Sequence, residues 1–336
     1  MTLKEKFKKT PSMYYAMSIA ATWAGVNSLM GGIEVAHQYG IVPYSLWAFG
    51  NILACILFGI LAPKIPKLRE VFRSRPMKII VGLLCVFQVW ISLNGIQGVF
   101  AETVLGSIFG QVIAYTLAAF YIIILWKRGM IRNVLTDHAS WIAVYALIAA
   151  LTAAAFTSNG DYPISIGLSG ENIAVGIEKC LLLLPGPFLY PYFFEILDYN
   201  DGNADGTQKT NIKKAFIGGG VLFGVYLLFA FALAFTSFGP ITGIVKAVLI
   251  TLIAVSSLSS FLYSVYIAFG KKLGLGINIA AVAAWQFLIP FGVMGVWTVM
   301  STIRIYIVGA AIIFSLFWHF RSKSNIVSNT KGGATQ

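Results

Sequence analysis

Long apolar runs, separated by short polar segments, dominate the pattern of this chain. Each run holds about 20 residues, the length that an α-helix needs to cross the hydrocarbon core of a bilayer. The runs predict an all-α polytopic membrane protein with ten transmembrane helices. The predicted bounds are 12–36, 42–62, 77–100, 104–126, 139–157, 173–197, 212–236, 241–269, 275–295 and 302–320. Because the connections are short, we expect one transmembrane domain over 1–336, with a disordered cytoplasmic tail at 322–336.

The first run contains a stretch that disfavours a regular helix. Gly25, Asn27, Ser28, Gly31 and Gly32 fall within eight positions, and a glycine costs about 1 kcal/mol relative to alanine inside a helix. A membrane helix is interrupted only where the freed backbone groups find partners or line a watery cavity. Two interpretations are open for this stretch alone. It is a discontinuous helix that holds an ion or solute, with Gly31 and Gly32 as hinge residues, or a helix whose small residues allow close packing.

The sixth run is also interrupted. Pro185, Gly186 and Pro187 stand between apolar segments, and a proline removes a backbone donor and clashes with the preceding turn. A tandem repeat of five spans must be inverted, so the sixth span is the counterpart of the first. The sequence therefore predicts an inverted five-plus-five repeat, 12–157 and 173–320, with broken helices 1 and 6 and a hinge at these three residues. A simple proline kink is the alternative.

Composition and charge indicate where the protein resides. Hydrophobic residues make up 58% of the 336 residues and charged residues 11%, compared with about 25% charged in soluble domains. With a cytoplasmic N-terminus, 21 of the 24 Lys and Arg residues fall in cytoplasmic segments, as the positive-inside rule requires; the exceptions are Lys179, Lys246 and Arg304. We therefore expect a plasma (inner) membrane protein with both termini in the cytoplasm. Its net charge of +12 favours anionic lipid as a partner over nucleic acid.

Side chains suited to catalysis are sparse. The three histidines, His37, His138 and His319, lie near the predicted ends of runs. No pair of carboxylates occurs together in the middle of a run, and no Cys/His spacing suits a metal. The sequence therefore argues against an enzyme and against an organic cofactor.

The eighth run carries a stripe of hydroxyl groups. Ser256, Ser260 and Ser264 recur every four residues, and Ser257 flanks them. Hydroxyl oxygens suit a small hard cation such as Na⁺. Interhelical hydrogen bonding is the alternative for these serines.

Several stretches resemble the sodium/solute symporter family. They are 20–28 (AATWAGVNS) continuing to 61–66 (LAPKIP), 253–260 (IAVSSLSS), and the break at Pro185 followed by a polar loop and 213–216 (KKAF). The chain resembles a minimal ten-helix form of that family, or another branch of the amino acid–polyamine–organocation superfamily, whose fold is the inverted five-plus-five repeat. The resemblance implies a sodium site at Ala21, Ala24, Ile253, Ser256 and Ser257. It also implies that Asn27 and Ser28 lie at the substrate cavity.

The third run supplies further candidates for that cavity. Trp90, Asn94 and Gln97 share one helical face, and a polar packing seam is the equal alternative. Together the patterns predict a secondary active transporter that works by alternating access, as a sodium-coupled symporter of a small organic solute. A membrane sensor or receptor of the same fold, or a proton-coupled or exchange transporter, is the competing hypothesis. The pattern does not indicate an oligomeric state.

Overall fold

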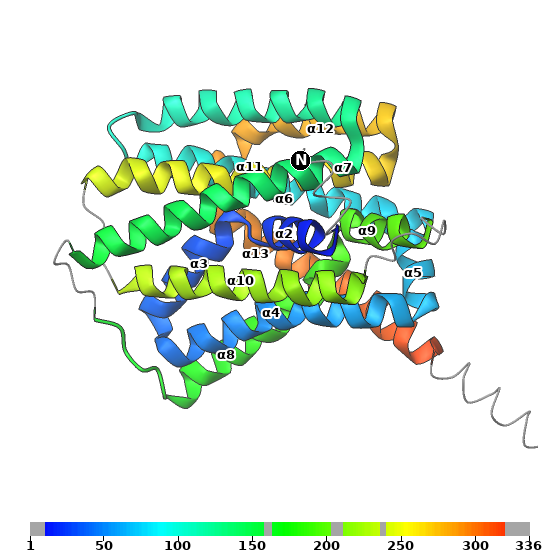
Figure 1. Cartoon of the computed structure of the whole chain (residues 1–336), viewed down its shortest axis with the longest axis horizontal. Helices are drawn as coiled ribbons and strands as arrows, with labels where there is room; N and C mark the ends of the chain where they lie inside the picture. Colours follow the sequence, from blue (N-terminus) through cyan, green and yellow to red (C-terminus); the bar gives the residue numbers. More distant parts are fainter. Residues whose placement is uncertain (1–10, 158–162, 203–210, 236–239, 320–336) are drawn as a thin grey trace, which may run out of the picture.

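The computed structural model describes residues 11–157, 163–202, 211–235 and 240–319 (Figure 1). These residues form helices joined by short connections, and no strand occurs among them. Eight helical segments of the described residues, some of which include a 3₁₀ or π-helical turn, are long and apolar enough to cross a membrane. The prediction of an all-α protein with transmembrane helices is therefore confirmed. The predicted disordered tail at 322–336 lies outside the described residues.

The helices follow the predicted apolar runs in order along the chain. They are α2 (Pro11–Trp23), α3 (Val26–Tyr39), α4 (Ile41–Lys64), α5 (Pro66–Arg73), α6 (Arg75–Ala101), α7 (Gly106–Thr157), α8 (Gly170–Leu183), α9 (Pro191–Gly202), α10 (Ile212–Ala234), α11 (Pro240–Phe269), α12 (Lys271–Ala284) and α13 (Gly292–Arg304). Short 3₁₀ turns are η1 (Gly186–Leu189), η2 (Trp285–Phe287) and η3 (Ile289–Phe291). A π-helical turn, η4 (Ile305–Gly309), follows α13 and leads into a further helix over 310–319.

Two of the ten predicted runs contain no described helical segment that is long enough to cross a membrane. The first run is α2 and α3, of 13 and 14 residues, separated at Ala24 and Gly25. The ninth run is α12, of 14 residues, followed by the turns η2 and η3. These pieces are shorter than the roughly 20 residues of a continuous span. Eight predicted spans thus have the length to cross a membrane, and the ten-helix inverted repeat stays a prediction.

Helix α7 contains both the fourth and the fifth predicted runs. It has 52 residues, whereas about 20 suffice to cross a bilayer. Its two apolar stretches, Gly106–Lys127 and Asn133–Thr157, run in opposite directions in Figure 1. The chain therefore reverses between them while it keeps helical backbone geometry, where the sequence predicts a connection.

Helices α6 and α11 form the centre of the molecule. They pack against each other and are the most deeply buried of the eight long helices. Helix α2 lies against α7, α10 and α11 (Figure 1), and every residue from Tyr14 to Trp23 is buried. The first interruption, which follows Trp23, is therefore enclosed by helices.

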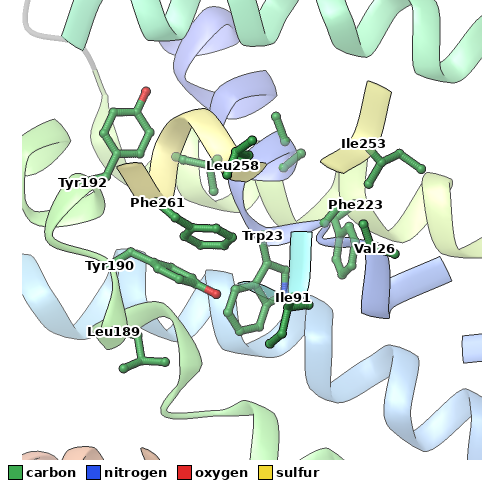
Figure 2. Close-up of a cluster of buried hydrophobic side chains, with 14 of the residues drawn as sticks. Trp23, Val26, Ile91, Leu189, Tyr190, Tyr192, Phe223, Ile253, Leu258 and Phe261 are labelled. Atoms are coloured by element: carbon green, nitrogen blue, oxygen red, sulfur yellow. The ribbon is translucent and has the colours of Figure 1, made fainter. Parts of the chain in front are cut away.

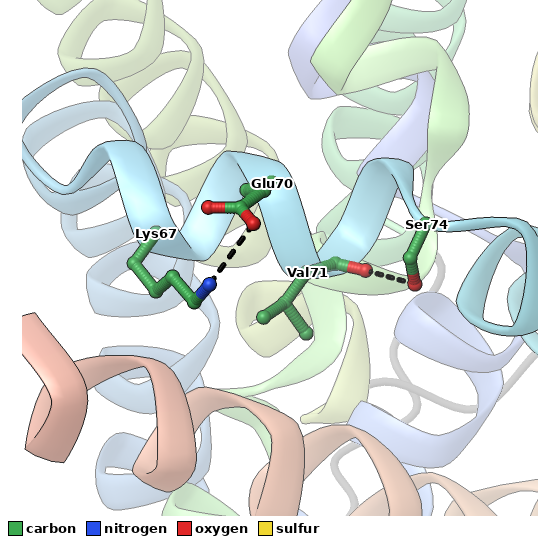
Figure 3. Close-up of polar contacts among 4 residues, drawn as sticks. All are labelled: Lys67, Glu70, Val71 and Ser74. Carbon is green, nitrogen blue, oxygen red and sulfur yellow. Dashed lines mark hydrogen bonds and ion pairs between the residues drawn. The ribbon is translucent and has the colours of Figure 1, made fainter.

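The short helix α5 lies at one end of the bundle, and its two faces differ in polarity. Leu68 is buried, whereas Lys67 is partly exposed and its Nζ donates to Glu70 Oε1 at 2.9 Å (Figure 3). At the end of α5, Ser74 Oγ donates to the carbonyl of Val71 at 2.7 Å. This bond satisfies one of the carbonyls that a helix C-terminus leaves without an intrahelical partner.

Helix α5 is also connected to the second half of the interrupted sixth run. Arg69 and Arg73 both form ion pairs with Asp198 of α9, and the Arg69 Nη2 to Asp198 Oδ1 distance is 3.0 Å. The connection between the second and third runs is thereby linked to the part of the chain that follows the second interruption.

Candidate functional site

The first interruption lies at Ala24 and Gly25, between α2 and α3. Gly25 is the N-cap residue of α3, with an extended backbone and no side-chain cap. Its carbonyl accepts a hydrogen bond from Ser28 Oγ at 2.6 Å. The first amides of a helix have no intrahelical partner, and the helix dipole places positive charge there. The start of α3 is therefore a polar, positive feature inside an apolar bundle.

The second interruption spans 184–190, between α8 and α9. Helix α8 ends at Leu183, η1 makes a single 3₁₀ turn, and α9 begins at Pro191. A side-chain carbon on Gly186 would overlap the ring of Trp23 and would lie 3.4 Å from Arg304 Nη1. Glycine at 186 therefore allows the second interruption to contact the first.

Aromatic side chains connect the two interruptions. The rings of Trp23 and Tyr190 meet edge to face at 5.8 Å, and the rings of Tyr190 and Phe261 lie 5.3 Å apart. Figure 2 shows these three side chains, from α2, the second interruption and α11, converging on one point. The two interruptions thus belong to one buried region, although they are more than 150 residues apart in sequence.

A small cavity lies in this region. Its volume is about 40 Å³, which leaves room for roughly three water molecules. Its aromatic lining residues are Trp23, Trp47, Tyr190, Phe261 and Trp297. Its polar and charged side chains are Asn27, Ser28, Asn51, Gln88, Lys179 and Arg304. The cavity therefore offers a small solute both apolar surface and hydrogen-bond donors.

Only part of the predicted substrate set lies at this cavity. Asn27 and Ser28 line it, as does the predicted hinge residue Gly31. Asn94 and Gln97 instead line a separate groove. The structure therefore places Asn27 and Ser28 at the same cavity, and the predicted candidates on α6 do not line it.

Two of the candidates on α6, Trp90 and Asn94, bond to α12 and to the segment that follows it. Trp90 Nε1 donates to the carbonyl of Ala281 at 2.7 Å. Asn94 Nδ2 donates to the carbonyls of Leu288 and Gly292 at 3.2 and 2.9 Å, and Asn94 Oδ1 accepts from Trp285 Nε1 at 2.7 Å. These bonds connect α6 to α12, to the turns that follow it and to the start of α13. They correspond to the polar packing seam that the sequence leaves open as an alternative.

The predicted hinge residues also lie in two different kinds of backbone. Pro185, Gly186 and Pro187 lie in the second interruption, whereas Gly31 and Gly32 lie within the continuous helix α3. At Gly32 a side-chain carbon would come within 2.9 Å of the Trp47 ring. Glycine at 32 therefore serves close packing, and the backbone is interrupted earlier, at 24–25.

The residues of the predicted sodium site come from α2, the first interruption and α11, and all five are buried. The two serines have different partners. Ser256 Oγ donates to Asp137 Oδ1 at 3.0 Å. Ser257 Oγ donates to the carbonyls of Ile253 and Ala254 at 3.2 and 3.0 Å, and lies 3.3 Å from Ser92 Oγ. The structure thus directs the two hydroxyls to different neighbours.

The partner of Ser256 is a buried carboxyl group that the sequence analysis missed. Asp137 is 1% exposed and accepts hydrogen bonds from Ser18 Oγ at 2.5 Å, Ser256 Oγ at 3.0 Å and Asn133 Nδ2 at 3.3 Å. Within the described ranges, no basic side chain forms an ion pair with Asp137. A buried carboxylate with no positive partner is costly. A bound cation or proton would therefore stabilise this site.

Further hydroxyl and amide groups surround Asp137. Thr22 Oγ1 donates to Ser260 Oγ at 2.8 Å, and Asn133 Nδ2 lies 3.1 Å from the same oxygen. Tyr192 Oη of α9 lies 2.7 Å from Ser18 Oγ. We call this set the Asp137 cluster: Ser18, Thr22, Asn133, Asp137, Tyr192, Ser256 and Ser260. Its oxygen atoms are the ligand type that hard cations prefer.

A signal for the Asp137 cluster is present in the sequence. Three pairs in it are spaced by four residues: Ser18 and Thr22, Asn133 and Asp137, Ser256 and Ser260. This spacing puts both members of a pair on one face of a helix. Asp137 was missed because the predicted fifth run begins at 139, whereas the helix already includes Asn133.

Neither a protein-family model nor a curated protein sequence matches this chain. Its function is therefore inferred from the two interruptions, the cavity and the Asp137 cluster.

Proposed function

We propose that this protein is a secondary active transporter that moves a small organic solute across the membrane by alternating access. The convergence of two interrupted helices on one buried cavity carries this proposal. Interrupted helices in a membrane are tolerated where their free backbone groups line a cavity. Broken helices that meet around a solute site are typical of secondary transporters.

The proposal includes an inverted repeat with halves 12–157 and 173–320. Its support is that the interruptions fall in the first and sixth predicted runs, which correspond in a five-plus-five arrangement. Each interrupted run contributes to the same cavity, α3 through Asn27 and α8 through Leu183.

We further propose that transport is coupled to a cation, with Na⁺ first and the proton second. The Asp137 cluster supports this because it supplies negative charge and hydroxyl oxygens without a positive side chain. It also includes Ser18 and Thr22 of α2, the helix that ends at the first interruption. A cation held there interacts with the same helix that borders the solute cavity. Coupling requires that each ligand favours the same conformation, and a shared helix provides that link.

Uptake by the purified protein in liposomes tests this proposal. A panel of labelled small solutes is offered under an inward Na⁺ gradient, an inward proton gradient, or no gradient. We expect at least one solute to accumulate above its external concentration under one cation gradient only. A solute that binds the protein but never enters the liposomes would contradict transport and favour the receptor hypothesis.

A further inference from the structure

Arg304 is a buried cation at the solute cavity. It ends α13, lines the cavity and is 2% exposed. Its Nη2 donates to the carbonyl of Leu182 at 2.7 Å, whereas its Nε has no hydrogen-bond partner. Within the described parts of the chain, no carboxylate forms an ion pair with it. Arg304 therefore carries a charge into the protein interior without a protein anion to balance it.

Other features at the cavity add to this positive charge. Lys179 of α8 lines the same cavity and is half-buried. The start of α3, at Gly25, presents the positive end of a helix dipole. The residues that line the cavity include neither aspartate nor glutamate. Every charged side chain among these residues is therefore positive.

The geometry of Arg304 leaves donors for a ligand. A guanidinium group has five N–H donors in a planar fork that matches the two oxygens of a carboxylate. One bond to Leu182 uses one of these donors. The π-helical turn η4 begins directly after Arg304, and such turns inside α-helices are frequent at functional sites. The bond to Leu182 alone does not account for a fully charged side chain at this depth, because a buried charge is costly unless it is paired.

We propose that the cavity recognises its solute through a negative charge, and that the solute is a short-chain monocarboxylate whose carboxylate binds Arg304. The apolar body of the solute packs against the aromatic rings of Trp23, Trp47 and Trp297. The small volume of the cavity, about 40 Å³, favours a body of few carbon atoms. This proposal deepens the proposed transport function and rests on it for the role of the cavity.

Thermal stability of the full-length protein in detergent tests the charge preference. The probes are acetate, propionate and butyrate, each compared with its neutral amide, and chloride serves as the inorganic anion. All samples contain the same Na⁺ concentration, so an effect of the coupling ion does not enter the comparison. A ligand that binds the folded state raises the melting temperature by mass action. We expect at least one carboxylate to raise it in a saturable way, and the matching amide and chloride to do so far less.

Substitution of Arg304 tests which residue binds the charge. In Arg304→Gln we expect the apparent dissociation constant of the carboxylate to rise about ten- to hundredfold, because a charge-assisted hydrogen bond is lost. We expect the melting temperature without ligand to stay equal or to rise, because an unpaired buried charge has been removed. Lys246→Gln is the matched control: it removes a cation that contacts Glu102 outside the cavity, and we expect it to leave binding unchanged.

The outcomes separate this proposal from its alternatives. Any one of four results would overturn it. The first three are equal stabilisation by a carboxylate and its amide, equal stabilisation by a carboxylate and chloride, and no stabilisation by any probe. The fourth is an unchanged carboxylate affinity in Arg304→Gln. If Arg304→Gln does not fold, Arg304→Lys decides: weaker carboxylate binding with the charge preference retained supports the proposal, and unchanged affinity overturns it. Carboxylate binding without uptake would contradict transport and leave this site intact. Uptake of a neutral solute at a rate that Arg304→Gln does not change would support transport and contradict the carboxylate site.

Discussion

At the residue scale, two adjacent serines of α11 contact different neighbouring helices. Ser256 and Ser257 are adjacent in sequence, so their side chains leave the helix about 100° apart. One reaches Asp137 of α7, and the other bonds within its own helix and lies near Ser92 of α6. A cation in the Asp137 cluster would therefore contact Ser256 and not Ser257.

We expect Ser256→Ala to raise the Na⁺ concentration for half-maximal uptake by roughly five- to hundredfold. The loss of one hydroxyl from a buried cation site costs about 1–3 kcal/mol. Ser257→Ala and Ser264→Ala should change it little; Ser264 is a buried serine two turns further along α11. Uptake measured against Na⁺ concentration checks this. A large effect of Ser257→Ala would favour the ligand set implied by the family resemblance, and uptake that ignores Na⁺ would favour proton coupling or exchange.

We expect Asp137→Asn to abolish cation-driven accumulation while solute binding survives. Asparagine keeps the shape of the side chain but removes the charge that attracts the cation. The melting temperature should stay equal or rise, because replacing a buried charge that lacks an opposite partner is often neutral or stabilising. Glu70→Gln is the control, since Glu70 is an exposed partner of Lys67 on α5 and such pairs are worth about 0–1 kcal/mol. Accumulation in Asp137→Asn that equals the parent's would rule out this carboxyl as the coupling group.

At the element scale, the two interruptions have different local causes. Two prolines, Pro185 and Pro187, act through the covalent structure of the backbone, because they lack an amide hydrogen and clash with the preceding turn. The glycines at 31 and 32 only reduce helix propensity, and packing against Trp47 maintains α3 at that point. A proline break is therefore visible in the sequence, whereas the exact site of a glycine-rich break is not.

We expect the double substitution Pro185→Ala/Pro187→Ala to slow or abolish transport while the protein still inserts into the membrane. Continuous helix would then satisfy the carbonyls that are freed at the second interruption. Gly186 is kept, because a side chain there would overlap Trp23 and confuse the result. Pro63→Ala, near the end of the continuous helix α4, is the control and should transport normally. Uptake rates measured at equal amounts of protein check this; an unchanged rate in the double variant would leave the motif as a packing kink.

At the scale of the whole molecule, buried helices surround the interrupted ones. α6 and α11 form the centre, and α2 is enclosed by α7, α10 and α11. The charge pattern adds an orientation to this arrangement, with 64–78 in the cytoplasm and 158–172 outside the cell. That orientation stays a prediction and is open to a direct test.

We expect Leu168→Cys to react with an impermeant thiol reagent in intact cells, and Arg75→Cys to react only after permeabilisation. Both positions are exposed, and the experiment uses a background without Cys55, Cys85 and Cys180, which are free thiols. The positive-inside rule is the reason for the expected sides. Labelling of Arg75→Cys from outside intact cells would contradict the predicted topology.

The sequence by itself determined the class of the protein, eight of its long helices and the place of its second interruption. These features depend on local properties: a run of apolar residues has the length to cross a bilayer, and Pro185 and Pro187 together remove two backbone donors within one turn. Asn27 and Ser28 were also expected at the cavity, but only through a resemblance. The sequence singled out Arg304 merely as an exception to the charge pattern.

Only the tertiary structure decided which polar residues meet. Asp137 lies 119 residues from both Ser18 and Ser256, and Arg304 lies 122 residues from Leu182. Trp90, Asn94 and Gln97 share a helical face, yet Trp90 and Asn94 bond to backbone carbonyls of α12 and α13 and do not line the cavity between the two interruptions. Periodicity specifies the face of a helix on which a side chain lies, but the partner opposite that face is set by how the helices pack. The charge balance of the cavity and of the Asp137 cluster therefore emerges only when all the helices are in place.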